Sequence, residues 1–264
     1  MIVFAHAERA APLKLHTSHL EYTNLFILLV AMQLFKEIRD SILHLAFPHV
    51  CEACGTDNLQ VDHLLCLRCL SSLPKTNFHL HSPNPVEKIF WGRMPLNCAT
   101  SQYYFTKESL IQHLMHQFKY KGNKDVGVYL GKLMGHALQE SGRFLSVDAL
   151  IPLPLHKSRE HKRGYNQATI LCEGIAEIIK KPVLKDAVIR AEYTESQTRK
   201  GRIQRWQNID GSFQVVKPNA ILGKHILLVD DVVTTGATLE ACGQQLLKVE
   251  NVQLSIATLC FSFH

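Results

Sequence analysis

The sequence contains no long hydrophobic run. Its one apolar stretch near the start, Leu25–Ala31, is far below the roughly 20 residues that a membrane-spanning helix requires, and it lacks a clear small-residue cleavage site of the kind that marks a secretory signal. Internal repeats and low-complexity tracts are missing too, so nothing indicates a repeat architecture. We therefore expect a cytoplasmic protein without a membrane span.

Single cysteines are few and stand in mostly apolar surroundings: Cys98, Cys172, Cys242 and Cys260. They do not form the dense framework of a small secreted protein, and we interpret them as buried thiols in a reducing compartment. A small core hydrophobe explains each of them better than a catalytic nucleophile does.

The composition is that of a globular protein. Of 264 residues, 46% are hydrophobic and 20% are charged, which suffices for one sizeable α/β domain and a small appendage. The net charge of +6, from 29 Lys and Arg against 23 Asp and Glu, permits an anionic partner, but plain solubility explains it equally well.

Three regions are expected. Residues 1–47 form an N-terminal extension whose apolar positions recur at helical spacing from Met32 to Ala46, and translation from Met1 and from Met32 both stay open. Residues 48–75 form a cysteine module. Residues 96–264 form the large domain, and the proline-rich stretch between Ser71 and Pro95 is interpreted as the linker.

The large domain alternates short apolar runs with amphipathic segments, which predicts a parallel sheet with helices on both faces. The expected helices carry Leu110, Leu114 and Phe118, then Val126 to Ala137, then Ala168 to Ile179, then Thr238 to Val249. The expected strands end at Tyr103–Phe105 or run over 148–155, 183–189, 225–229 and 252–260. A basic loop is expected after Leu155.

The cysteine module contains two Cys-x-x-Cys pairs separated by eleven residues, and the four thiolates are Cys51, Cys54, Cys66 and Cys69. Such a set suits a tetrahedral Zn²⁺ ion, and four protein ligands leave no open position, so the predicted zinc is structural. Two disulfides are the alternative, disfavoured by a reducing compartment. His49 and His63 are interpreted as bystanders.

The sequence HILLVDDVVTTGATLEAC, residues 225–242, carries the strongest functional pattern. Asp230 and Asp231 follow an apolar strand, at the end where open α/β sheets bind ligands, and can accept hydrogen bonds from ribose hydroxyls. The loop after them contains Thr234, Thr235, Gly236, Ala237 and Thr238. Its backbone N–H groups and the following helix N-terminus favour a phosphate, and Gly236 allows close approach.

This segment resembles the phosphoribosyl-pyrophosphate (PRPP) binding motif of type I phosphoribosyltransferases. Two further segments, IPLPLHKSREHKRGYNQA at 151–168 and TESQTRKGRIQRWQNIDGSF at 194–213, are similar to the ComF family of amidophosphoribosyltransferase-like proteins. The second resembles that family's signature through Gln197, Arg205, Asn208 and Phe213, although Arg199 and Lys200 stand where the family often has leucine.

The resemblance implies a type I phosphoribosyltransferase-like domain with an N-terminal four-cysteine zinc ribbon, a PRPP or related phosphoribosyl ligand, and Mg²⁺. Lys157, Arg159 and Arg163 would hold the pyrophosphate, since arginine forks suit phosphate contacts. Residues 192–210 would close over the site as a hood. A solvated basic turn and a flexible loop without a catalytic role are the alternatives for these two segments.

Two function classes stay open. The first is a Mg²⁺-dependent phosphoribosyltransferase, a glycosyltransferase whose acceptor the sequence does not reveal. The second is a non-catalytic adaptor in DNA uptake and competence, which would use the phosphate site to sense a nucleotide or to bind an end of single-stranded DNA, with a helicase as the partner that the family implies. A zinc-ribbon DNA-binding regulator is weaker, because it leaves residues 225–242 without a purpose.

Overall fold

The computed structural model describes residues 26–41 apart from 27, 37 and 40, residues 50–59 apart from 58, and residues 63–190 and 213–262. The chain divides into two compact units, Met1–Val50 and Cys51–His264. In the first unit residues 28–36 are helical, so this helix begins before Met32. Within the described ranges, every helix is too short or too polar to cross a bilayer.

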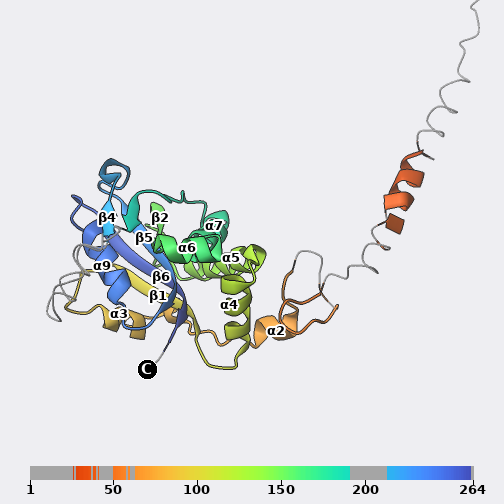
Figure 1. The fold of residues 1–264 in the computed structure, drawn as a ribbon, viewed down its shortest axis with the longest axis horizontal. Coiled ribbons are helices and arrows are strands. Elements are labelled where there is room, and N and C mark those ends of the chain that lie inside the picture. Colours follow the sequence, from red (N-terminus) through yellow and green to blue (C-terminus); the bar gives the residue numbers. More distant parts are fainter. Residues whose placement is uncertain are drawn as a thin grey trace, which may run out of the picture. The chain divides into compact units, whose positions relative to one another are not determined.

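The second unit is built on a four-stranded parallel sheet of order β1-β6-β5-β2 (Figure 1). Its strands are β1 (Cys98–Tyr104), β2 (Ala149–Pro152), β5 (His225–Val233) and β6 (Gln253–Phe261). All four coincide with predicted apolar runs, and the parallel pairing confirms the α/β class. Residues 183–189 form only an isolated bridge at Val183 and the start of a short strand.

Helices cover both faces of this sheet (Figure 1). On one face, Leu227 and Val229 of β5 pack with α4 (Leu110–Tyr120), α5 (Lys124–Glu140) and α7 (Gln167–Ile179). On the other face, Ile226 and Leu228 pack with α3 (Pro85–Ile89), α9 (Ala237–Leu246) and the antiparallel pair β3 (Val188–Arg190) and β4 (Phe213–Val215). Side chains alternate along β5 because successive strand residues face opposite sides.

The proline-rich segment is not a linker, and that prediction was wrong. After α2 (Leu67–Ser71) the chain forms a 3₁₀ turn, η1 (Phe78–Leu80), and then α3, and it buries Phe78, Val86 and Phe90 in the core. Pro85 occupies the first turn of α3, where a missing N–H costs nothing. The Asn84 side chain caps that helix. Regular structure therefore forms in this segment although it is rich in proline.

The basic segment after Leu155 is also different from the prediction, because it forms α6 (Lys157–Arg163) instead of a loop. The His156 side chain caps its start and Gly164 ends it with φ +79°. Lys, Arg and Glu are good helix formers, and none of the residues in α6 is buried, so the hydrophobic period that reveals other helices is missing here.

The cysteine module shares its core with the large domain. Cys51, Cys66 and Leu73 belong to the same buried cluster as Leu114 and Phe118 of α4. A hydrogen bond of 2.7 Å from the Gln117 side chain to the Glu52 carbonyl oxygen adds a polar contact. The predicted boundary between residues 48–75 and 96–264 therefore does not separate two packing units.

Helices α5 and α7 approach each other at backbone contact distance. A Cβ atom on Gly174 would overlap the carbonyl oxygen of Val128, and one on Gly131 would overlap that of Leu171. Only hydrogen fits at these two positions, and this allows α7 to pack directly on the backbone of α5.

We predict that Gly174→Ala destabilises the protein. On helix propensity alone alanine would add about 1 kcal/mol of stability, but overpacking typically costs about 1–3 kcal/mol, so the midpoint of urea unfolding should fall. His136→Ala, on the exposed side of α5, is the control and should change the midpoint little. A higher midpoint for Gly174→Ala would contradict the close packing.

Candidate functional site

A pocket of about 320 Å³ lies where β2 and β5 end. These strands pair in parallel, with Pro152 opposite Val229, so the residues that follow Pro152 meet the residues that follow Val229. Parallel sheets place ligands at this edge. The polar lining consists of Lys119, Arg159, Arg163, Asn166, Gln167, Arg190, Asp230, Asp231 and Thr238.

The two predicted acids both line this pocket. They lie within β5, which continues to Val233, and not beyond the end of the strand as expected. The Asp231 carboxylate lies 2.7 Å from the Lys119 ammonium group, and the Asp231 N–H donates a 2.8 Å hydrogen bond to Asp230. Burial raises the pKa of Asp230, and the charge of Asp231 raises it further.

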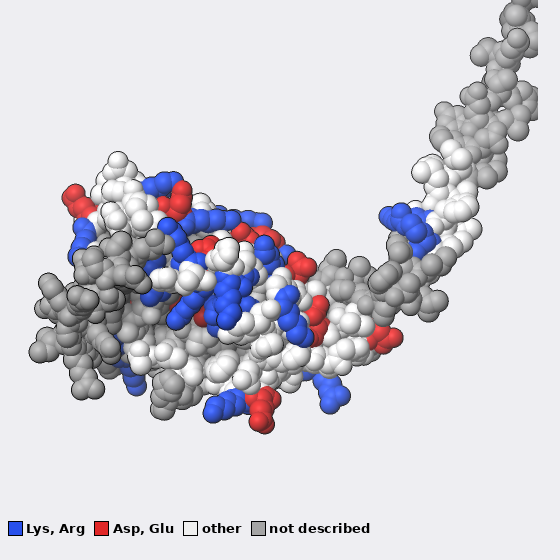
Figure 2. Space-filling model, in the orientation of Figure 1, with Lys and Arg blue, Asp and Glu red and all other residues white. Residues whose placement is uncertain are grey.

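Four cations surround the acids, from two helices and a strand. Arg159 and Arg163 come from α6, Lys119 from α4 and Arg190 from β3. Lys and Arg side chains gather on the face where Figure 1 places α6 (Figure 2). Burial lowers the pKa of Arg190, and electrostatic repulsion from Arg159 lowers it further. The positive charges of these two arginines therefore interact. Lys157 is exposed and is not part of the lining.

The Arg163 guanidinium is held in place by its neighbours. It donates a 2.7 Å hydrogen bond to the Gln167 side chain and lies 5.8 Å from the centre of the Tyr120 ring. Asn166 caps α7 and also donates to the Leu153 carbonyl oxygen at 3.0 Å. The bond to Leu153 fixes the start of α7 against the residues that follow β2.

The threonine loop leads from β5 into α9. Gly236 has φ +75°, a left-handed conformation that glycine adopts without strain, and it stands at the start of α9 without a side-chain cap. Thr234, Thr235 and Thr238 are exposed, and Thr238 lines the pocket, whereas the lining does not extend to Thr234–Ala237. The first amides of α9 therefore keep their capacity to bind an anion.

The sequence of this chain is similar to those of known proteins. A family model described as "Phosphoribosyl transferase domain" matches residues 167–263, which include α7, the acids and the threonine loop. The DNA utilization protein YhgH of Escherichia coli O157:H7 is 30% identical over 223 residues, covering 82% of this chain and 92% of that protein. The chain belongs to the ComF family.

Two further relatives of this ComF-family chain have names that refer to competence. Competence protein F of Haemophilus influenzae is 28% identical over 72% of the chain and 88% of that protein. Competence protein ComFC of Bacillus subtilis is 26% identical over 72% of the chain and 80% of that protein. The fold that the ComF resemblance implied, a phosphoribosyltransferase-like α/β domain, is thus confirmed.

Sequence reasoning did not assign Lys119, Asn166, Gln167 and Arg190 to the site of this ComF-family chain. Lys119 lies in the last turn of α4, whose sequence shows only the hydrophobic spacing of a packing helix. Because Lys119 and Asp231 are far apart in the sequence, no local pattern predicts their contact. Asn166 and Gln167 belong to the segment at 151–168 that resembles the ComF family, and this resemblance was the one available signal. The expected hood at 192–210, with Gln197, Arg205 and Asn208, lies outside the described residues; Phe213 begins β4.

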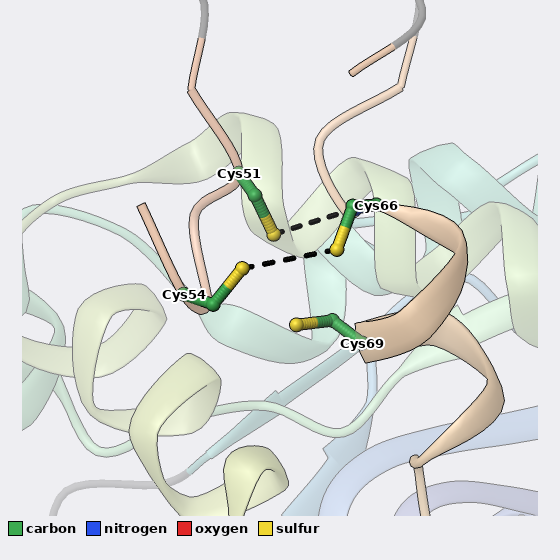
Figure 3. A group of neighbouring side chains, drawn as sticks. All are labelled: Cys51, Cys54, Cys66 and Cys69. Atoms are coloured by element: carbon green, nitrogen blue, oxygen red, sulfur yellow. Dashed lines mark hydrogen bonds between the residues drawn. The ribbon is translucent and has the colours of Figure 1, made fainter. Parts of the chain in front are cut away.

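The four predicted zinc ligands come together in the second unit (Figure 3). The sulfur atoms of Cys51, Cys54, Cys66 and Cys69 lie within 4.8 Å of one another, and the Cys54 and Cys66 sulfurs are 3.8 Å apart. A tetrahedral zinc ion with Zn–S bonds of about 2.3 Å requires sulfur atoms about 3.8 Å apart. The cluster therefore fits a metal ion, and none of its cysteines is in a disulfide.

The backbone favours the thiolate form of Cys51, one of the four cysteines. Burial raises the pKa of Cys51, but N–H groups of Cys66, Cys54 and Ala53 outweigh it and lower that pKa to about 6. The Cys66 N–H lies 3.3 Å from the Cys51 sulfur. A thiolate is the form that binds metal, so these N–H groups favour the ligand state of Cys51, whereas burial and the neighbouring cysteines raise the pKa of Cys69.

We predict that Asp230→Asn stabilises the protein at neutral pH. The pKa of Asp230 is raised in the folded state, so as pH rises above about 4 the unfolded carboxyl ionises first and stability falls. Asparagine cannot ionise, so the variant does not lose stability as this carboxyl would deprotonate. The difference in unfolding free energy between Asp230→Asn and the wild type should therefore grow from pH 5 to pH 8, reaching on the order of 1–2 kcal/mol. Urea unfolding at several pH values measures it.

The matched control for that series is Asp186→Asn. Asp186 is an exposed carboxylate whose pKa Lys217 lowers, so its replacement should leave stability unchanged or slightly reduced at the same pH values. Equal effects of the two substitutions, or a gain for Asp230→Asn that disappears at high pH, would show that Asp230 is not held in a costly environment.

Proposed function

We propose that this chain binds PRPP, or a related ribose 5-phosphate, together with Mg²⁺ in the pocket at the end of β5. The observation that carries the proposal is the convergence of two carboxylates, four cations and the start of α9 on one cavity. Carboxylates suit sugar hydroxyls, while cations and free helix amides suit phosphates. The match to a phosphoribosyl transferase domain supports the same ligand class.

Each part of PRPP then has partners of matching chemistry. The 5-phosphate would lie against the loop Thr234–Thr238, and the ribose hydroxyls would donate to Asp230 and Asp231. The pyrophosphate would lie against Arg159 and Arg163, whose guanidinium groups form two parallel hydrogen bonds with phosphate oxygens. The sequence grouped Lys157 with these arginines, but Lys157 does not line the pocket, so we do not assign it a direct contact with the pyrophosphate.

The donor set also fits Mg²⁺, which prefers carboxylate and phosphate oxygens. When bound, Mg²⁺ would neutralise charge on the pyrophosphate. Asp230 and Asp231 would hold it through the carboxylate oxygens that the Asp231 N–H and the Lys119 ammonium group do not contact. If the chain transfers the pentosyl group, Arg159 and Arg163 would stabilise the departing pyrophosphate as the bond to C1 breaks.

We further propose a role in DNA utilisation or uptake, which the names of the relatives support. Under this role the site acts either as a phosphoribosyltransferase or as the ligand-sensing site of a non-catalytic adaptor for single-stranded DNA or a helicase. The two differ in whether PRPP is consumed.

We predict that Arg163→Ala weakens PRPP binding in the presence of Mg²⁺ about 10- to 100-fold, because a charged hydrogen-bond partner of phosphate contributes about 1.5–3 kcal/mol. Isothermal titration calorimetry measures it. Lys157→Ala removes the same charge from α6 outside the pocket lining and should change the affinity less than about 3-fold. Equal losses for both variants would point to diffuse charge attraction and against a defined pyrophosphate site.

Turnover is tested separately. Sustained pyrophosphate release from PRPP with candidate amines, abolished by Asp231→Asn, supports the enzyme. PRPP binding without release, together with salt-dependent binding of single-stranded DNA that survives the same substitution, supports the adaptor.

We also propose that the cysteine cluster holds a structural Zn²⁺ ion. We predict about one zinc per chain by elemental analysis, and a fall in thermal midpoint when a strong chelator removes it, because Cys51, Cys66 and Cys69 are part of the core shared with α4. Cys54→Ser should lower the zinc content, whereas Cys98→Ser, outside the cluster, should not. Full zinc content in Cys54→Ser would exclude this ligand set.

A further inference from the structure

The threonine loop rests on the segment that contains α3. A Cβ atom on Gly236 would lie 2.7 Å from Ile89 Cγ2 and 2.8 Å from Phe90 Cε1, so the loop backbone is in direct contact with these side chains. The segment itself is fixed, because Asn84 caps α3 and the buried Glu87 forms an ion pair with Arg143. The loop therefore has a rigid support on the α3 side.

Arg93 joins this support to the loop. Its guanidinium donates hydrogen bonds to the Ile89 carbonyl oxygen at 3.0 Å and to the Thr235 carbonyl oxygen at 2.8 Å. It also forms an ion pair with Glu240, in the first turn of α9. One side chain thus bridges α3, the loop and the start of α9.

The bond to Thr235 sets the direction of an amide. Only Ser82-Pro83 is cis among the described peptide bonds, so the Thr235–Gly236 bond is trans, and its C=O and N–H point in opposite directions. Since Arg93 holds the carbonyl toward α3, the Gly236 N–H points away from α3. An amide fixed in advance binds an anion without the cost of ordering the loop.

The ion pair with Glu240 has an electrostatic effect on the same place. A carboxylate in the first turn of α9 competes with a phosphate for the positive end of the helix dipole. The ion pair with Arg93 neutralises the Glu240 carboxylate and holds it toward the segment that contains α3. Without Arg93, the Glu240 charge would oppose a bound phosphate.

We propose that Arg93 is the positioning residue of the 5-phosphate subsite: it fixes the Thr235–Gly236 peptide and neutralises Glu240, without touching the ligand. This inference rests on the proposed function. It predicts that loss of Arg93 impairs binding of the 5-phosphate and leaves binding of the pyrophosphate, at Arg159 and Arg163, unaffected.

The test uses the full chain, with ribose 5-phosphate and inorganic pyrophosphate as separate calorimetric probes. Arg93→Ala should weaken ribose 5-phosphate binding at least 10-fold and change pyrophosphate binding less than 2-fold. Arg93→Ala combined with Glu240→Gln should regain part of the loss, because the repelling charge is gone. Lys88→Ala, a cation on the same segment that lies over Trp91 and not at the loop, is the control and should leave both affinities unchanged.

Each other outcome counts against the proposal. If Arg93→Ala binds both probes like the wild type, Arg93 has no positioning role; if it loses both equally, the residue only supports the fold. Should Arg93→Ala fold poorly, Arg93→Lys keeps the charge but cannot bridge both partners, and it should show an intermediate loss for ribose 5-phosphate alone. Failure of the wild type to bind ribose 5-phosphate would instead overturn the proposed function itself.

Discussion

The parallel pairing of β5 with β2 and β6 is the constraint on which the site depends. Because all strands of the sheet run in one direction, their carboxyl ends share an edge, and the loops that leave them are forced together. Asp230, the threonine loop and the residues after Pro152 thus meet although up to about 80 residues separate them in sequence. The buried apolar faces of β5 maintain this arrangement from both sides.

Helix α4 connects the cysteine cluster with the pocket. One part of it packs against Cys51 and Cys66 and donates from Gln117 to Glu52, while Lys119, near its end, contacts Asp231. The helix is rigid over such a short length, so the position of the lysine depends on the packing at the cysteines. A module that looks separate in the sequence therefore contributes to the geometry of the acids.

Residues whose role depends on their own sequence neighbourhood could be predicted. The strands, the long helices, the two Cys-x-x-Cys pairs and the segment Asp230–Thr238 all have a local pattern, either a hydrophobic period or a motif with fixed spacing. Lys119, Arg190 and Arg93 have none, since each is an ordinary charged residue that becomes important through a contact with a distant segment. The proline-rich segment was predicted wrongly because its local composition is typical of a loop. Its structure depends instead on Val86 and Phe90, which are buried in the core.

The close contact between α5 and α7 has a consequence for the size of the pocket. Gln167 and Ala168 at the start of α7 form one wall, and α7 packs directly on the backbone of α5 because Gly131 and Gly174 have no side chains. Any larger residue at either glycine would move that wall, although neither glycine is part of the lining. The width of the pocket thus depends on atoms that are not part of its lining.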